Sequence, residues 1–156
     1  MADEAKIGFA LDGSLGKLAK WLRIMGFDSV YVPGIPRENF LFYGNEGRIL
    51  LTRTRRIQTK NPGHHLLFIR FNDPREQLLQ VISELKIDFS VIKPFSRCIR
   101  CNLALNEISR EQARPFIPDY VYETRFSFRK CPSCGRIYWP GTHGNAVINI
   151  IHDIFA

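Results

Sequence analysis

Apolar residues near the start of the chain switch between two periods, one typical of strands and one typical of helices. The segment KIGFALD, residues 6–12, is a short apolar run that predicts a strand ending at Asp12. Four apolar residues then recur at spacings of three, four and three, which places them on one face of a helix. They are Leu15, Leu18, Leu22 and Met25. Ser14 is suited to cap the start of this helix and Gly26 to end it.

The same alternation continues to about residue 95. Three further apolar runs predict strands. They are SVYV at 29–32, RILLT at 48–52 and HLLFIRF at 65–71. A short helix is expected near residues 37–43, and residues 72–85 predict a longer one, with Asp73 as N-cap and Pro74 at the first helical position. Strands that alternate with helices favour an α/β fold with a mostly parallel sheet flanked by helices.

Beyond residue 95 the pattern changes to cysteines, turn residues and aromatic residues. The segment KPFSRC, residues 93–98, marks the boundary, and a last helix is expected around residues 145–155. We therefore expect an α/β domain over residues 1–95 and a smaller module with a C-terminal helix over residues 96–156.

The four cysteines of the chain form two CxxC pairs. Each pair can form a tight knuckle whose backbone amides point at its thiolates, and two knuckles give a tetrahedral four-thiolate site. The 29 residues between the pairs exceed the common ribbon spacing and predict an inserted loop. Two disulfides or one redox CxxC are the alternatives, and a reducing location disfavours the first. The sequence predicts a zinc ribbon with structural Zn²⁺ held by Cys98, Cys101, Cys131 and Cys134.

The charge of the chain indicates what kind of molecule the protein binds. The chain has 156 residues, of which 22 are Lys or Arg and 15 are Asp or Glu, so its formal net charge is +7. Residues 1–95 carry 14 basic and 10 acidic groups, and residues 96–156 carry 8 and 5. Both parts are basic, which is typical of a protein that binds a polyanion such as nucleic acid. The alternative is that the charge serves solubility alone.

The expected cellular location rests on two patterns that the sequence does not show. The first ten residues show no signal-peptide pattern, and no apolar run approaches the roughly 20 residues that cross a bilayer. We expect a cytoplasmic protein without a membrane partner. Protein partners and oligomeric state are not indicated.

Basic residues gather in two places that suit RNA. The candidates are Lys17, Arg53, Arg55 and Arg56 beside the strand ends, and Arg100 and Lys130 beside the cysteines. Aromatic residues such as Tyr138 and Trp139 are interleaved with the second group. Unpaired bases stack on rings and phosphates pair with cations, which is typical of single-strand binding. The alternatives are a solvated helix face for the lysines and a small ribbon core for the rings.

Asp12 is the candidate for chemistry, because ligands of α/β sheets bind at the carboxyl ends of the strands. A carboxylate there suits a divalent metal, and helix capping is an equally ordinary role. The other acids that strand-end loops could bring near it are Asp28, Glu38 and Asp73, and capping also accounts for Asp73.

Four segments in order resemble the mut-seven carboxy-terminal RNase domain family. They are FALDGSLGKLAKWLRIMGFD, GRILLTR, RCIRCNLAL and CPSCGRIYWPGTH, and the resemblance covers about residues 7–150. It implies a PIN-like α/β nuclease domain with a C-terminal zinc ribbon, and RNA-directed, Mg²⁺- or Mn²⁺-dependent phosphodiester hydrolysis. Asp12 then matches the first-strand acid of the family, and the four cysteines match its ribbon ligands.

This chain departs from the family pattern after the third strand. The pattern usually continues LLTRD, whereas Thr54 stands here in the place of the acid. A threonine hydroxyl cannot replace a carboxylate as an anionic metal ligand, and the neighbouring arginines repel a cation. The family has another acid at the start of the second helix, which matches the Arg37–Glu38 region. Glu38 is the candidate for this acid, although the alignment of the region is not fixed to one residue.

Three hypotheses follow. In the first, the protein is a ribonuclease in which Asp12, Glu38 and Asp73 hold a catalytic Mg²⁺ or Mn²⁺. In the second, it is a catalytically inactive RNA-binding or interaction module stabilised by structural zinc. In the third, it is a zinc-stabilised protein-interaction domain with no role in nucleic-acid binding.

Overall fold

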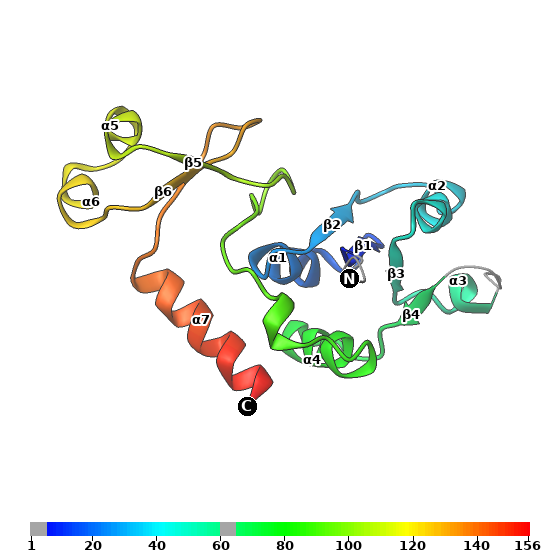
Figure 1. Cartoon of the computed structure of the whole chain (residues 1–156). Coiled ribbons are helices and arrows are strands. Elements are labelled where there is room, and N and C mark those ends of the chain that lie inside the picture. The colour runs from blue at the N-terminus through cyan, green and yellow to red at the C-terminus, as the bar shows by residue number, and fades with distance from the viewer. Residues whose placement is uncertain (1–5, 60–64) are drawn as a thin grey trace, which may run out of the picture.

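A parallel sheet forms the first half of the molecule. The computed structural model describes residues 6–59 and 65–156. The strands of this sheet are β1 (Gly8–Leu11), β2 (Asp28–Tyr31), β3 (Ile49–Thr52) and β4 (Leu66–Phe68). They are all parallel, in the order β2-β1-β3-β4 (Figure 1). The α/β fold with a parallel sheet flanked by helices is therefore confirmed.

Helices cover both faces of this sheet, because successive side chains of a strand point to opposite faces. Phe9 and Leu11 belong to one buried cluster, whereas Ala10 and Leu50 belong to another. The helices are α1 (Gly16–Ile24) and α4 (Pro74–Glu84) on the first face, and α2 (Arg37–Phe42) and α3 (Arg55–Thr59) on the second (Figure 1). A 3₁₀ turn, Tyr43–Glu46, leads from α2 towards β3. The sequence pattern had not indicated α3.

The ends of α1 and α4 show which capping predictions hold. Gly26 follows α1 with a φ of 96°, and a Cβ there would lie 2.6 Å from the Lys93 carbonyl oxygen, so glycine is required. Asp73 caps α4 as expected, by accepting from two backbone amides. Ser14 does not cap α1, since the helix begins after Leu15 without a side-chain cap. Its hydroxyl binds Asp12 instead.

The cysteine-containing part forms a separate antiparallel sheet, in the order β5-β6-β7. Its strands are Asn106–Ile108, Phe128–Lys130 and Ile137–Tyr138. The predicted inserted loop contains α5 (Arg110–Ala113), a 3₁₀ turn (Arg114–Phe116) and α6 (Asp119–Thr124). These elements bury Ala113, Ile117 and Val121 with Phe128 in a small core of their own. In Figure 1, α5 and α6 lie at the end of the molecule farthest from the parallel sheet.

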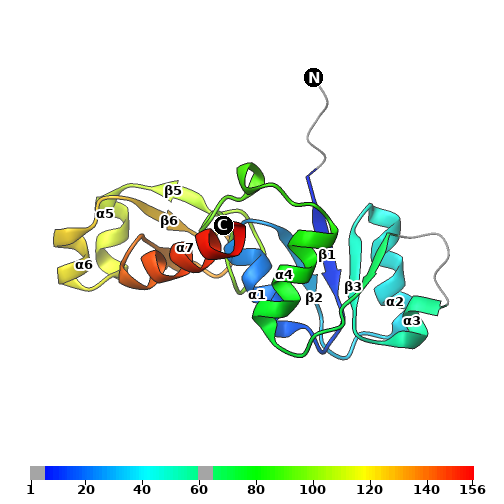
Figure 2. The same ribbon diagram turned by 90° about the horizontal axis from the view of Figure 1, so that it is seen from below.

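The last helix returns to the first half of the chain. α7 (Thr142–Phe155) leaves the ribbon and runs beside α1 and α4 (Figure 2). Ile151 is buried in the same cluster as Phe9, and Phe155 meets Phe89 in the 3₁₀ turn Phe89–Val91, with ring centroids 5.4 Å apart. The helix expected at 145–155 is thus present, and it packs on the core of the α/β part. The division into 1–95 and 96–156 stays a prediction.

Candidate functional site

Asp12 joins the ends of the two central strands. It directly follows β1, and its backbone amide donates to the Leu51 carbonyl on β3 at 3.1 Å. Its buried carboxylate accepts four hydrogen bonds. On Oδ1 the donors are the amide and hydroxyl of Ser14, at 3.0 and 2.7 Å. On Oδ2 they are the Thr52 hydroxyl and the Arg53 amide, at 2.5 and 2.9 Å. Both carboxylate oxygens are therefore occupied by the protein itself.

A cleft of about 380 Å³ opens beside Asp12 at the carboxyl edge of the sheet. We call it the Asp12 cleft, and its polar lining consists of Asp12, Ser14, Arg37, Thr54 and Arg56. The strand-end loops after β1, β2 and β3 bring these residues together, because parallel strands end at one edge. Of the described residues, one carboxylate and two guanidinium groups line the cleft, so this part of the lining has a net positive charge, which suits an anion.

The other predicted acids do not line this cleft. Glu38 lies exposed in the first turn of α2, next to Arg37. Asp73 is exposed at the start of α4, and its Oδ1 accepts from the amides of Arg75 and Glu76 at 2.9 and 3.2 Å. The expectation for Asp28 was wrong, because Asp28 begins β2 and therefore lies at the opposite edge of the sheet.

These positions do not fit a divalent metal in the Asp12 cleft. Among the described residues, the four cysteines are the sole group of three or more cysteine, histidine or acidic side chains close enough to share an ion. Mg²⁺ and Mn²⁺ prefer several oxygen ligands, whereas Asp12 already accepts four hydrogen bonds beside two arginines. The catalytic assignment of Asp12, Glu38 and Asp73 stays a prediction.

The predicted RNA-binding residues of the first half differ in their surroundings. Arg53 donates to the Phe71 carbonyl and the Asn72 side chain, so it braces the loop between β4 and α4. The Arg55 guanidinium lies 5.6 Å from the centre of the Phe68 ring. Arg56 lines the Asp12 cleft, and Lys17 is exposed on α1.

Arg37 is a cleft residue that the sequence reasoning missed as a binding residue. The signal was present, since Arg37 follows the turn segment PGIP after the strand that contains Tyr31. A residue directly after a strand-end turn is expected at the carboxyl edge of a parallel sheet.

The cysteines form a second candidate site, in which two knuckles repeat the same backbone bonds. In the first knuckle, residues 98–102, the Asn102 amide donates to the Cys98 carbonyl at 2.9 Å. In the second, residues 131–135, the Gly135 amide donates to the Cys131 carbonyl at 3.1 Å. Asn102 and Gly135 both have positive φ, 59° and 75°. The four sulfur atoms lie within 4.8 Å of one another, which fits a four-thiolate metal site.

The first knuckle also favours a thiolate. Burial raises the pKa of Cys98, but the Tyr138 hydroxyl and the amides of Cys101 and Arg100 outweigh it, so the pKa falls to about 6. The Tyr138 oxygen lies 3.1 Å from the Cys98 sulfur. Burial and the neighbouring sulfurs raise the pKa of Cys101 to about 11. A metal cation would stabilise all four thiolates together.

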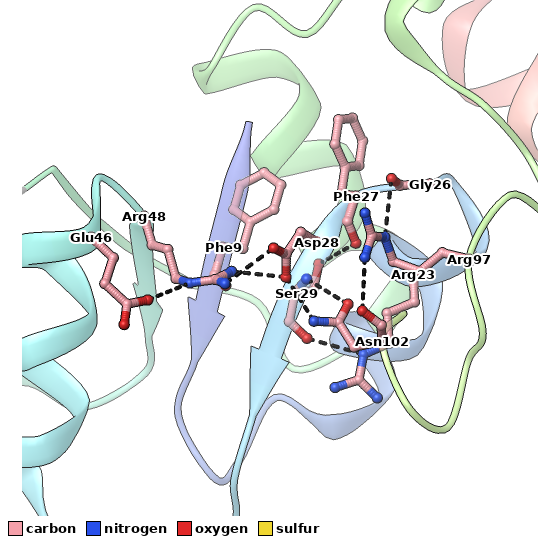
Figure 3. A network of polar contacts seen from close by, with 10 residues as sticks. All are labelled: Phe9, Arg23, Gly26, Phe27, Asp28, Ser29, Glu46, Arg48, Arg97 and Asn102. Carbon is pink, nitrogen blue, oxygen red and sulfur yellow. Dashed lines mark hydrogen bonds and ion pairs between the residues drawn. The ribbon is translucent and has the colours of Figure 1, made fainter. Parts of the chain in front are cut away.

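A polar network attaches the first knuckle to the amino edge of the parallel sheet (Figure 3). The Asn102 side chain accepts from the Ser29 amide at 2.8 Å and donates to Asp28 Oδ1 at 2.7 Å. Arg48 pairs with the same carboxylate at 2.9 Å. Burial raises the pKa of Asp28, but the bonds from Arg48 and Asn102 outweigh it and hold the pKa below its usual value. From α1, Arg23 donates to the Ile99 carbonyl at 2.8 Å.

The two predicted RNA-binding residues of the second half lie apart from the Asp12 cleft. Arg100 is exposed on the first knuckle. Lys130 is on β6, far from α3 in both views (Figures 1 and 2), and its ammonium lies 5.4 Å from the centre of the Phe116 ring.

Within the described ranges, every helix is too short or too polar to span a bilayer.

Comparison with known families gives one assignment. The family model described as Mut7-C RNAse domain matches residues 7–151, nearly the whole chain, including the Asp12 cleft and all four cysteines. No curated protein and no solved structure matches the chain. The protein belongs to the Mut7-C RNAse domain family.

Proposed function

We propose that this protein is a nuclease-like domain that binds the phosphodiester backbone of RNA in the Asp12 cleft. The observation that carries the proposal is the lining of the cleft, where Arg37 and Arg56 stand beside the hydroxyls of Ser14 and Thr54. Guanidinium groups bind phosphate oxygens in a fork, and hydroxyls add single hydrogen bonds. The net charge of +7 and the RNase family support RNA as the polyanion.

In this proposal Asp12 is a positioning residue. Its carboxylate holds Ser14 on one side and the start of the Arg53–Thr54 loop on the other. Thr54 is further fixed by its amide, which donates to the Thr52 hydroxyl at 3.0 Å. The cleft is therefore shaped before RNA arrives, which lowers the ordering cost of binding.

Metal-dependent ribonuclease activity is the second candidate, and the family favours it. Catalysis would need further acids around the ion. Thr54 lines the cleft beside Asp12, so Thr54→Asp tests whether one missing acid separates this chain from a nuclease. In this candidate, Mn²⁺-dependent cleavage appears or rises in the variant.

We also propose a metal that stabilises the fold of the ribbon. We expect Zn²⁺ to be the metal that the four thiolates hold, because a closed four-cysteine site is typical of structural zinc. The units 1–95 and 96–156 and a cytoplasmic location belong to the same proposal.

Binding and cleavage are separated by one experiment on the full chain. Labelled single-stranded RNA is titrated by fluorescence anisotropy at several salt concentrations, and the same samples are run on a denaturing gel with and without added Mn²⁺. A double variant, Arg37→Ala with Arg56→Ala, is expected to weaken binding and to reduce the salt slope by about 0.7 per lost phosphate contact. Arg75→Ala is the matched control, an exposed arginine on α4 outside the cleft.

Equal binding by the double variant and the control would contradict the cleft proposal. Cleavage that needs Mn²⁺ and is lost in Asp12→Asn, at a temperature where that variant is folded, would establish the second candidate.

A further inference from the structure

Two adjoining cavities flank Tyr138 and Trp139, where the ribbon meets α7. Their volumes are about 270 and 480 Å³, and both include Tyr138, Trp139 and Gly144 in their lining. We call the pair the Trp139 groove. Its rings are Phe95, Tyr120, Tyr138 and Trp139. Its cations are Arg125, Arg129 and Arg136, and none of the described residues that line either cavity carries a carboxylate.

The central rings of this groove are held in place from behind. Trp139 packs against Phe128 of the ribbon core, with ring centroids 6.5 Å apart. The Tyr138 hydroxyl is fixed by the Cys98 sulfur at 3.1 Å and by the Ile99 amide at 3.2 Å. Neither ring has to be ordered when a ligand arrives, which favours binding.

Tyr120 extends the ring surface outward. It lies on α6 and is 68% exposed, so its ring is accessible to a ligand. Phe95 lines the smaller cavity, where its carbonyl accepts from the Arg129 side chain at 2.9 Å. The two cavities share Tyr138, Trp139 and Gly144, and Tyr120 of α6 lines the larger one.

The charge of the groove selects the ligand. Three guanidinium groups without a carboxylate attract a polyanion, and the rings offer flat surfaces at which unpaired bases stack. A duplex keeps the faces of its bases covered, whereas a single strand presents them. We infer that the Trp139 groove binds single-stranded RNA, with bases on the rings and phosphates on the arginines. The choice of RNA rests on the proposed function, whereas the site is separate from the Asp12 cleft.

Trp139 supplies a direct readout. The chain has two tryptophans, and Trp21→Phe leaves Trp139 as the sole indole. In this background, a ten-nucleotide single-stranded RNA is expected to quench Trp139 fluorescence, and a duplex of the same length to quench it less. Equal quenching by the duplex would overturn the inference.

Two groove variants, each with a matched control, test whether RNA binds in the Trp139 groove. Fluorescence anisotropy measures the affinity of each variant for single-stranded RNA. Tyr120→Ala is expected to weaken binding about fivefold or more. Its control is Phe116→Ala, since Phe116 is equally exposed, at 68%, on the same insertion but outside the groove. Arg125→Ala is expected to reduce the salt slope by about 0.7. Its control is Arg114→Ala, which removes a guanidinium stacked on Tyr122 at 4.5 Å.

The outcomes separate this inference from the proposed function. If the groove variants bind like wild type while the Arg37/Arg56 double variant is weakened, the inference is wrong and the cleft proposal stands. The reverse pattern supports the groove and contradicts the cleft. Wild-type protein that binds no single-stranded RNA overturns both.

Discussion

The two edges of the parallel sheet each carry an aspartate, and the two aspartates have different partners. At the carboxyl edge, Asp12 accepts from local amides and hydroxyls and leaves a cleft open beside it. At the amino edge, Asp28 pairs with Arg48 and Asn102, and the first cysteine knuckle covers that edge. The difference shows that the fold uses one edge for attachment of the ribbon, whereas a cleft opens at the other.

The largest effect is expected from a variant that disrupts the proposed metal site and leaves the carboxyl edge of the parallel sheet intact. Cys131→Ser takes a buried ligand from the four-thiolate site, and structural zinc binding contributes about 10 kcal/mol or more to small zinc modules. We expect loss of bound zinc by elemental mass spectrometry and loss of amide protection in β5–β7, with protection retained in β1 and β3. Ser133→Ala, in the same knuckle, is the control. Full zinc occupancy in Cys131→Ser would contradict the four-ligand site.

Asp12→Asn is expected to destabilise the carboxyl edge by about 1–3 kcal/mol. The amides of Ser14 and Arg53 donate to different carboxylate oxygens, so one of them must face the new amide group of asparagine. Asp73→Asn is a sharp control, because both amides at Asp73 bond to Oδ1 alone and asparagine caps helices equally well. Urea denaturation measures both variants, and equal free energies of unfolding would contradict the geometry at Asp12.

Asn102 tests the left-handed backbone of the knuckle that docks on the amino edge. Asn102→Gly keeps the positive φ but loses the bonds to Ser29 and Asp28, whereas Asn102→Ala also has to adopt φ near 59°. The alanine variant is expected to be about 1 kcal/mol less stable than the glycine variant in thermal or urea unfolding. Gly135→Asn in the second knuckle is the reference, because asparagine tolerates that conformation and has no such attachment to lose. Equal stability of the two Asn102 variants would show that the left-handed backbone is not retained.

The smallest effect is the pH dependence of Asp28. Its pKa is lowered in the folded protein, so its contribution to stability is present above the unfolded pKa of about 3.9 and is lost as the pH falls through the folded value. The side chain is 41% exposed, so solvent screening keeps this contribution well below about 1 kcal/mol. The stability difference between wild type and Asp28→Asn is expected to shrink below pH 4. A difference that grows below pH 4 would contradict the assignment.

Much of the candidate site could be predicted from sequence where the chemistry is local. A CxxC knuckle closes within five residues, so the spacing of Cys98, Cys101, Cys131 and Cys134 already indicated a four-thiolate site, and the structure brings these sulfurs together. Asp12 could be placed at the carboxyl edge because it follows an apolar run. Arg56 was placed beside it for the same reason.

Predictions that depended on side-chain direction were less successful. Asp28 was expected near Asp12, but a residue that begins a parallel strand lies at the opposite edge from one that follows a strand. The RNA-binding assignment of Arg53 stays a prediction, and the sequence did not indicate that its guanidinium bonds to the loop at Phe71 and Asn72. The insertion between the cysteine pairs was expected as a loop, and its short helices are held by burial of Ile117 and Val121 rather than by a long apolar period.

By itself the sequence determined the parallel α/β architecture, the four clustered cysteines and the basic character of the protein, because periodicity, ligand spacing and charge are properties of short segments. The tertiary structure alone decided which edge of the sheet stays open. That choice depends on Asn102, Arg23 and Asp28, which are distant in sequence and meet only when the first knuckle docks on β2. It also decided that Trp139 and Tyr120 share a groove, because α6 and β7 come together only around the buried Phe128.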